Sequence, residues 1–173
     1  MLTTLIAGLM LGDYPARFAP DGAKVEFTLE KGSSFTMQMA PKLAPKTVAR
    51  IIDLVKQGFY DQQRFHRVEY WVTQWGAPAS KTKPLTDNAV LDGGSGVSLP
   101  FEGCDRDFVR GVVGVASEGL QLGGDSQLFI LKGDRLYLYG SYAIIGMVTR
   151  GMDVVDGIKK GDRIRSVRVK TPR

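Results

Sequence analysis

The sequence predicts a mainly β protein built as one antiparallel barrel or sandwich. Short runs rich in β-branched and aromatic residues recur along the 173 residues, only two stretches have helical periodicity, and strands and helices do not alternate. The 21 glycines agree with many turns between short strands. A chain of this length can bury one core, so we assign residues 24–173 to a single domain and residues 1–23 to an apolar N-terminal segment and lead-in.

The sequence predicts some strands more clearly than others. Apolar residues alternate in KVEFTLE (24–30) and SFTMQM (34–39), and the turn sequence KGSS joins them, so an antiparallel hairpin opens the domain. Residues 64–76 are interpreted as a strand pair, or as a strand and a loop. The later strands are expected in the runs GVVGVAS, SQLFILK, YAIIGMVT and IRSVRVK.

Two segments have helical patterns. In residues 44–61, Pro45 suits a first helical turn, apolar residues recur at helical spacing, and Gly58 offers a left-handed stop. In residues 151–161, Asp153 lies in the first turn and two lysines lie in the last, which complements the helix dipole. We expect the first helix to lie with its apolar stripe on the sheet.

Two further segments lack a regular pattern. Residues 81–107 are rich in Gly, Pro, Asp and Ser, and we expect a long irregular loop of the kind that is functional or mobile. Residues 1–12 are apolar enough for a secretory signal but too short to span a bilayer, and they lack a basic start and a clear cleavage site. An atypical signal and a short element packed on the domain both remain open. We expect no integral membrane span and a cytoplasmic location, with export as the alternative.

Composition excludes several kinds of site. Cys104 and His66 are each the only residue of their type, so neither an intrachain disulfide nor a Cys/His metal cluster is expected. We interpret both residues as structural. The formal net charge of +5 raises nucleic acid as a partner. The basic residues are diffuse, however, and their densest run, in residues 159–173, alternates with valines as in an edge strand protected by charges.

Motifs in a fixed order carry the functional signal. They are FHRV at 65–68, Q-x-G at 74–76, FE at 101–102, GVVGVA at 111–116, SQLFI at 126–130 and GMDVVD at 151–156. In this order and spacing, over residues 24–170, the sequence resembles the cyclophilin-type peptidyl-prolyl cis-trans isomerases. The resemblance implies an eight-stranded antiparallel closed β-barrel capped by two α-helices, with a proline-binding groove on its outer face. It also implies a monomeric isomerase that acts on proline-containing peptides or unfolded protein segments and assists folding.

The resemblance assigns roles to the positions that match the family's motifs. The family's catalytic arginine falls on Arg67, and the glutamine that assists it falls on Gln74. The substrate-binding positions of the groove fall on Trp71, Val72, Ala116, Ser117, Gln127, Phe129, Tyr137, Leu138 and Tyr142.

The sequence departs from the family pattern at several of these positions. The loop after FHRV is one residue shorter and has lost its Pro-Gly turn. Ser117 stands where the family has asparagine, Leu128 replaces a phenylalanine, Tyr137 replaces tryptophan and Tyr142 replaces histidine. An arginine, a glutamine, an aromatic floor and an aliphatic wall are kept, whereas the shape of the pocket changes.

These residue types suit isomerisation of an Xaa-Pro bond. Rotation is slow because the C–N bond has double-bond character, with a barrier of about 18–20 kcal/mol, and no bond needs to break. A guanidinium such as that of Arg67 stays charged and can donate to the proline nitrogen, which accepts better when the amide is twisted. The apolar residues would hold the pyrrolidine ring, and the main chain near Ala116 and Ser117 would hold the residue before the proline. No metal or cofactor is needed, and we expect none.

Two other functions remain as alternatives to the isomerase. Because the groove is reshaped, the barrel could hold a proline-bearing peptide without accelerating its rotation, as a catalytically weak binding module. The net charge of +5 would suit a nucleic-acid-binding barrel. We do not expect nucleic acid as a partner, because the sequence lacks the combined aromatic and basic platform of single-strand binders.

Overall fold

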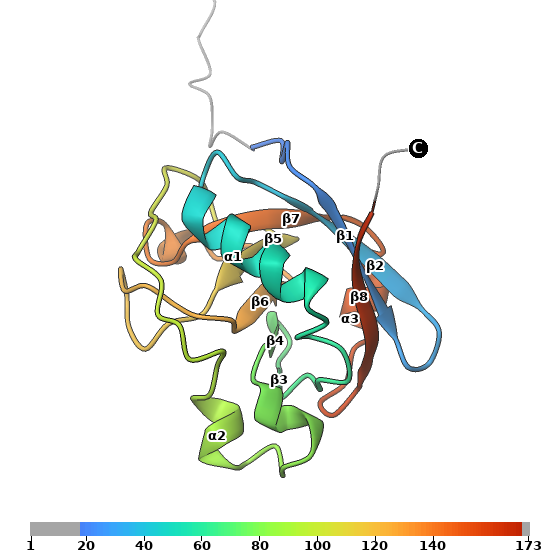
Figure 1. Cartoon of the computed structure of the whole chain (residues 1–173). Coiled ribbons are helices and arrows are strands. Elements are labelled where there is room, and N and C mark those ends of the chain that lie inside the picture. The colour runs from blue at the N-terminus through green and yellow to red at the C-terminus, as the bar shows by residue number, and fades with distance from the viewer. Residues whose placement is uncertain (1–17, 171–173) are drawn as a thin grey trace, which may run out of the picture.

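One curled antiparallel sheet of eight strands forms the body of the molecule (Figure 1). The computed structural model describes residues 18–170, so the apolar segment predicted at residues 1–12 lies outside the described residues. The spatial order of the strands is β3-β4-β6-β5-β7-β2-β1-β8. They are β1 (Lys24–Leu29), β2 (Ser34–Met39), β3 (Arg67–Val68), β4 (Val72–Trp75), β5 (Val112–Val115), β6 (Leu128–Leu131), β7 (Ile144–Arg150) and β8 (Ile164–Lys170).

The sheet is an open half-barrel, and the prediction of a closed barrel is wrong. Its end strands, β3 and β8, do not pair with each other. Between them the segment 62–65 runs along 161–164 through main-chain hydrogen bonds, with a single isolated β-bridge at Arg64 and Arg163. Gln62, at the start of this segment, has a left-handed conformation (φ 67°), and β3 itself has only two residues.

Within residues 18–170, three helices accompany the sheet, whereas two were predicted. They are α1 (Pro45–Lys56), α2 (Asn88–Leu91) and α3 (Met152–Asp156), with 3₁₀ turns at Pro78–Lys81 and Leu136–Leu138. The helices α1 and α3 lie where periodicity predicted them, and α2 lies in the segment predicted to be irregular. The Asp87 side chain accepts a hydrogen bond from the main-chain nitrogen of Ala89 (2.9 Å), which stabilises α2 as one capped turn too short for a periodic pattern.

The start of α1 is held by a residue far away in the sequence. Its N-cap, Ala44, has no side chain that can accept a hydrogen bond. The Glu102 carboxylate takes this role and accepts hydrogen bonds from the main-chain nitrogens of Lys46 (3.1 Å) and Thr47 (2.8 Å). The long loop between residues 81 and 107 is therefore fastened to the helix.

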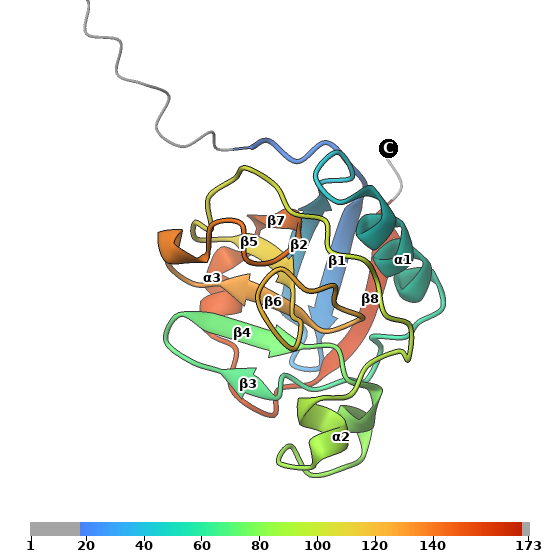
Figure 2. The ribbon, with the colours of Figure 1, turned by 90° about the vertical axis from the view of Figure 1, so that its left-hand side faces the viewer.

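Aromatic rings fill the concave side of the half-barrel. Trp75 is fully buried, with its ring centroid 5.3 Å from those of both Phe27 and Phe65, and Phe27 stacks on Phe35 at 4.8 Å. The apolar stripe of α1 joins this core through Ile51, and the helix lies against β8 (Figure 2). Alternation along β1 and β2 therefore places their apolar residues as the sequence predicted.

A second apolar layer covers the convex side of the sheet at β6. All four residues of β6 are buried, because Leu128 and Ile130 face the inner core while Phe129 and Leu131 face outward. The outward residues belong to a group that we call the outer cluster: Val72, Phe108, Val112, Phe129, Leu131 and Ile144. This cluster provides an apolar base for a surface site.

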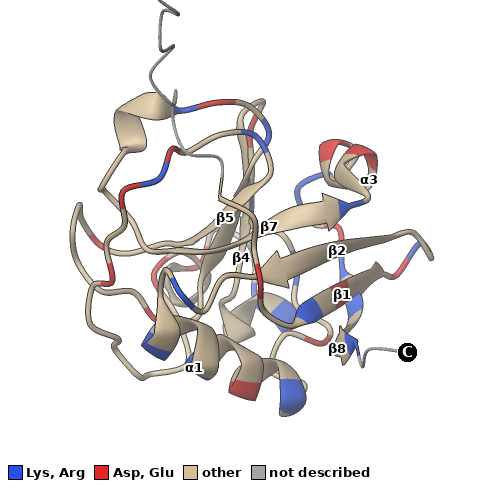
Figure 3. Ribbon diagram, turned by 90° about the horizontal axis from the view of Figure 1, so that it is seen from above, with Lys and Arg blue, Asp and Glu red and all other residues tan. Residues whose placement is uncertain are grey.

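The basic run near the C-terminus forms an edge strand with paired charges. In β8, Arg168 pairs with Asp61 (2.8 Å) and Lys170 pairs with Glu26 (2.7 Å). Figure 3 shows basic and acidic residues on the same elements, including α1. The strand is therefore a protected edge of the sheet, as its alternation with valines predicted.

Replacement of Gly76 by alanine is expected to destabilise the protein severely. Gly76 follows β4 with φ +127°, and a Cβ there would overlap the main chain of Ser126 and Gln127. Alanine at this position would be strained by the positive φ, and the main chain of the neighbouring strand would also have to move. We therefore expect Gly76→Ala to lower the free energy of unfolding by more than about 3 kcal/mol.

The matched control is Gly32→Ala in the β1–β2 turn. Gly32 also has a positive φ (+94°), but a Cβ there meets no described residue within 4 Å. Urea unfolding should show a loss of only about 1–2 kcal/mol for this variant. Equal losses for the two variants would contradict the proposed overlap.

Candidate active site

Three predicted site residues lie in one row across neighbouring strands. Arg67 of β3 is paired with Gln74 of β4, and Gln74 is paired with Phe129 of β6. Phe129 in turn is opposite Gly114 of β5. Directly opposed residues project from the same face of a sheet, so this register brings the three side chains together on the convex face. Figure 2 shows strands β3, β4 and β6 side by side.

A chain of side-chain amides fixes the arginine. Arg67 Nη1 donates to Gln74 Oε1 (3.5 Å), and Gln74 Nε2 donates to Gln127 Oε1 (2.7 Å). Gln127 Nε2 then donates to the carbonyl oxygens of Leu91 (2.9 Å) and Gly93 (2.8 Å). We call Gln74 and Gln127 the amide chain, since they connect the guanidinium to the C-terminal end of α2 and the loop that follows it.

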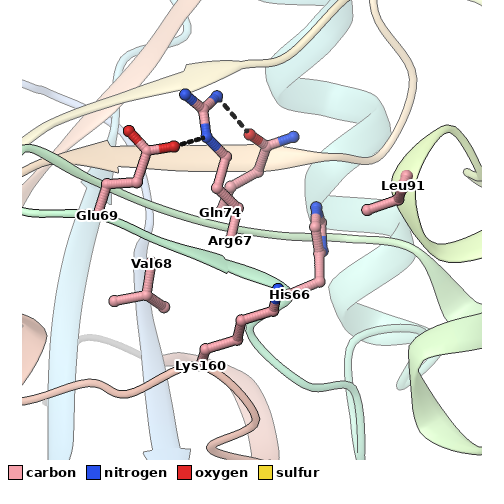
Figure 4. Close-up of a pocket in the computed structure, with 7 residues that line it drawn as sticks. All are labelled: His66, Arg67, Val68, Glu69, Gln74, Leu91 and Lys160. Atoms are coloured by element: carbon pink, nitrogen blue, oxygen red, sulfur yellow. Dashed lines mark hydrogen bonds and ion pairs between the residues drawn. The ribbon is translucent and has the colours of Figure 1, made fainter. Parts of the chain in front are cut away.

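A carboxylate missed in the sequence also holds Arg67. Arg67 Nε donates to Glu69 Oε1 at 2.7 Å, as Figure 4 shows. This hydrogen bond lowers the pKa of Glu69 below its ordinary value. Glu69 lies two residues beyond Arg67, a spacing that places both side chains on the same face of an extended chain, so the strand period could have identified it.

Aromatic and aliphatic side chains form an apolar floor beside the arginine. The Phe129 ring centroid lies 5.5 Å from that of Tyr142 and 6.4 Å from that of Phe108. Six predicted substrate-binding residues belong to the outer cluster or pack on it: Trp71, Val72, Ala116, Phe129, Leu138 and Tyr142. Val72 is only 2% exposed and therefore supports the floor from below.

Trp71 is held between charged neighbours at the edge of this floor. The guanidinium carbons of Arg67 and Arg135 each lie 5.2 Å from its ring centroid. Arg135 also lies over the Tyr70 ring, at 5.4 Å. These cation–π contacts link the predicted arginine to an arginine that no motif had indicated.

Two of the predicted substrate-binding residues do not lie on the apolar floor. Tyr137 is 73% exposed and is not part of the outer cluster, so the structure does not bring it onto the apolar floor. Ser117 lies beyond the floor, where its hydroxyl donates to the Gly119 carbonyl oxygen (2.7 Å).

Two neighbouring cavities open on this face. The first cavity, of about 400 Å³, is lined by His66, Arg67, Val68, Glu69, Gln74, Leu91 and Lys160 (Figure 4). The second cavity, of about 680 Å³, is lined by residues from the segments 91–98, 116–118 and 122–125, together with Gln74 and Gln127. Gln74 and Leu91 line both cavities, so the two spaces adjoin at the amide chain.

The single histidine borders the first cavity in a neutral state. His66 is 3% exposed, and its Nδ1 has no hydrogen-bond partner among residues 18–170. Burial, followed by the positive charges of Lys160 and Arg67, lowers the pKa of His66 from 6.5 to about 4. The imidazole therefore carries no charge at neutral pH.

The described part of the chain has neither a cluster of metal ligands nor a reactive thiol. Within residues 18–170, no group of three or more His, Cys, Asp and Glu side chains could hold a metal ion. No helix in the same range is long and apolar enough to cross a membrane. Burial raises the pKa of the Cys104 thiol, which keeps it protonated at neutral pH.

Comparisons with known proteins agree with this arrangement. The family model "Cyclophilin type peptidyl-prolyl cis-trans isomerase/CLD" matches residues 24–172. A probable peptidyl-prolyl cis-trans isomerase of Brucella suis is 36% identical over 168 residues, which cover 95% of this chain and 86% of that protein. Peptidyl-prolyl cis-trans isomerase B of Bacillus subtilis is 33% identical over 146 residues, with 83% and 95% covered.

Solved structures show the same fold. A cyclophilin-type peptidyl-prolyl cis-trans isomerase of Cryptosporidium parvum superposes with a TM-score of 0.73 at 19% identity, covering 87% of this chain and 99% of that chain. A second C. parvum structure, obtained in the presence of the dipeptide Ala-Pro, gives a TM-score of 0.71 over 86% of this chain and 99% of that one.

The fold and the sequence matches together define the class of protein as a peptidyl-prolyl isomerase. Within that class, the chain belongs to the cyclophilin-type family. The predicted family and enzyme class are confirmed.

Acidification is expected to destabilise the protein through His66. Between the folded pKa of about 4 and the ordinary value of 6.5, the unfolded chain binds a proton that folded His66 does not. The free energy of unfolding should therefore fall as the pH is lowered through this window, by up to about 3 kcal/mol from this group.

NMR can test this directly, because His66 is the only histidine. Its imidazole Cε1 proton should show no titration step between pH 5.5 and 8, and His66→Gln should have a shallower dependence of stability on pH. A midpoint near the ordinary value of about 6.5 would show that the folded protein does not suppress protonation.

Proposed function

We propose that this isomerase accelerates rotation about Xaa-Pro bonds by presenting Arg67 to the twisted amide beside an apolar proline pocket. The supporting observation is the cross-strand row, in which Gln74 alone separates Arg67 from Phe129. Substrates would be proline-containing peptides and unfolded protein segments, so that the activity assists protein folding.

Part of the Arg67 guanidinium is available to donate hydrogen bonds to a substrate. Its Nε is occupied by Glu69 and its Nη1 by Gln74, whereas Nη2 donates to no residue in the range 18–170. A twisted amide has a pyramidal nitrogen that accepts a hydrogen bond better than the planar ground state does. A guanidinium held in place before the substrate arrives stabilises that state selectively, which lowers the rotation barrier.

The apolar floor would hold the proline while the rest of the peptide turns. Phe129 provides its base, and Leu138, Tyr142 and Trp71 pack around it as partly buried side chains. The Ser117 hydroxyl is engaged with Gly119, so the main chain near Ala116 and Ser117 is the part available to hold the residue before the proline. The C. parvum structure obtained with Ala-Pro supports short proline peptides as ligands for this fold.

One observation favours a catalytically weak binding module as a second candidate. Tyr137, at the position that the family resemblance assigns to the groove, is 73% exposed and does not pack on the outer cluster. A looser pocket would bind the proline without restraining it during rotation. The same rate measurement separates the two functions.

Arg67→Ala is expected to lower kcat/KM for a short Ala-Pro peptide by at least about tenfold, because the main donor to the twisted amide is removed. Exchange NMR of cis and trans peptide signals measures the rate. Arg165→Ala is the matched control, since Arg165 is exposed on β8, where its side chain makes no hydrogen bond or ion pair within residues 18–170. This control should keep the full rate.

An unchanged rate in Arg67→Ala would overturn the role of the arginine. If the wild-type protein shifts the peptide resonances without accelerating exchange, the chain is a binding module.

Gly114→Ala is expected to displace the Phe129 ring and thereby disturb the proposed proline pocket. A Cβ at this position would lie 2.7 Å from Cε1 and 3.0 Å from Cε2 of Phe129, so the ring must tilt out of its place in the floor. We expect kcat/KM to fall by about tenfold, with a loss of unfolding free energy of only about 1–3 kcal/mol, since one movable ring gives way.

Gly157→Ala is the control, because its Cβ would make only ordinary contacts at 3.6 Å, far from the floor. Unchanged activity in Gly114→Ala would show that the position of the Phe129 ring does not limit catalysis.

A further inference from the structure

The turn between β3 and β4 brings a carboxylate onto the arginine of the site. Residues 69–72 form this turn, which is closed by a hydrogen bond from the Glu69 main-chain nitrogen to the Val72 carbonyl oxygen (2.8 Å). Glu69 lies two residues after Arg67, so both side chains project from the same face of the extended chain. Figure 4 shows the carboxylate directed at the guanidinium.

Packing alone does not fix the Arg67 side chain. It is 44% exposed and belongs to a strand of only two residues at one end of the sheet. A long side chain with several freely rotating torsions would place its guanidinium in many orientations. Its polar and aromatic contacts therefore decide where the remaining donor points.

Among the described residues, Glu69 makes the strongest of these contacts. Arg67 Nε donates to Glu69 Oε1 at 2.7 Å, the length of a charge-assisted hydrogen bond, which is about twice as strong as a neutral one. The bond from Arg67 Nη1 to Gln74 Oε1 is 3.5 Å long, at the outer limit for a hydrogen bond. The third contact is the Trp71 ring, 5.2 Å from the guanidinium carbon, and a cation–π contact does not select the direction of a single N–H group.

The carboxylate orients the guanidinium without occupying all of it. Glu69 accepts from Nε, whereas neither Nη atom donates to it in the part of the chain that the structure describes. A guanidinium is planar and holds its donors in a fixed fork. Once Nε is bound to Glu69 and Nη1 is directed at Gln74, the direction of Nη2 is determined.

The ion pair between Arg67 and Glu69 is exclusive within residues 18–170. Glu69 pairs with no other cation there, and Arg67 pairs with no other carboxylate. Arg135, the other arginine at this edge, lies over the Trp71 ring instead. The hydrogen bond from Arg67 is the main cause that lowers the pKa of Glu69, so the carboxylate is charged at neutral pH.

We propose that Glu69 is the positioning residue of Arg67 and holds the guanidinium in the orientation that meets the twisted amide. This role rests on the proposed function, because it requires Arg67 to be the catalytic donor. Glu69 acts only through the arginine and touches neither the proline nor the rotating bond. Since an exposed ion pair contributes little to stability, the effect of Glu69 is on orientation rather than on folding.

Glu69→Ala is expected to lower kcat for a short Ala-Pro peptide by about five- to tenfold, while KM stays within about twofold. The reason is that a mobile guanidinium is lost mainly to the transition state, not to the bound ground state. Exchange NMR at several peptide concentrations separates the two constants. The urea midpoint of unfolding should move by less than about 0.3 M.

Asp156→Ala is the matched control. Asp156 pairs with Arg110 at 2.6 Å, and both side chains are 43% exposed, close to the 44% and 42% of Arg67 and Glu69. The substitution removes an equally exposed ion pair and the same charge, and Asp156 lines neither cavity. This variant should keep the kcat and KM of the wild-type protein.

Two further variants show whether Glu69 acts through the arginine. Glu69→Gln keeps an oxygen that can accept from Nε, so its kcat should lie within about threefold of the wild-type value. In the Arg67→Ala background, Glu69→Ala should cause no additional loss of rate, because the group that it positions is already absent.

A kcat of Glu69→Ala equal to or above that of the wild-type protein would overturn the positioning role. So would a failure of Glu69→Gln to restore the rate, a rise of KM in place of the fall in kcat, or an additional loss in the absence of Arg67. In each of these cases a slow Arg67→Ala variant would leave the isomerase function intact. If the wild-type protein accelerates no peptide, the proposed function itself fails.

Discussion

The register between β3, β4, β6 and β5 is the constraint on which the site depends. Because Arg67, Gln74, Phe129 and Gly114 occupy one cross-strand row, a donor, an amide and an aromatic ring are brought to one face by backbone pairing alone. A slip of one residue in β4 would direct Gln74 into the inner core and Trp75 outward. The buried Trp75, packed among Phe27 and Phe65, opposes that slip, so the inner core and the outer site stabilise the same register.

The amide chain also fixes the positions of residues that lie outside the sheet. Gln127, which directly precedes β6, donates to main-chain carbonyls at the end of α2 and just after it, and Glu102 fastens another part of the same long segment to α1. The cavity wall therefore has defined positions although it lacks strands or long helices. Site geometry in this protein depends on two glutamines and one glutamate as much as on the half-barrel.

Sequence patterns predicted those parts of the fold that depend on neighbours in the chain. Alternation revealed β1 and β2, periodicity revealed α1, and motif order revealed the family. The open form of the sheet was missed because no local pattern shows that β3 has only two residues or that a left-handed residue, Gln62, precedes it. The amide chain was missed because the contact of Gln127 with residues 91–93 joins segments with no common pattern, although Glu69 was accessible from the strand period.

The pairing of β1 with β8 brings Lys24 opposite Lys170, so the first and last described strands are neighbours in the sheet. During synthesis β1 leaves the ribosome early, and one of its edges stays unpaired until every other described element has been made. Such a long-range pairing closes late in folding, and an open edge is a site for wrong associations in the meantime. This isomerase therefore has a nascent state with an open sheet edge that is itself prone to wrong associations.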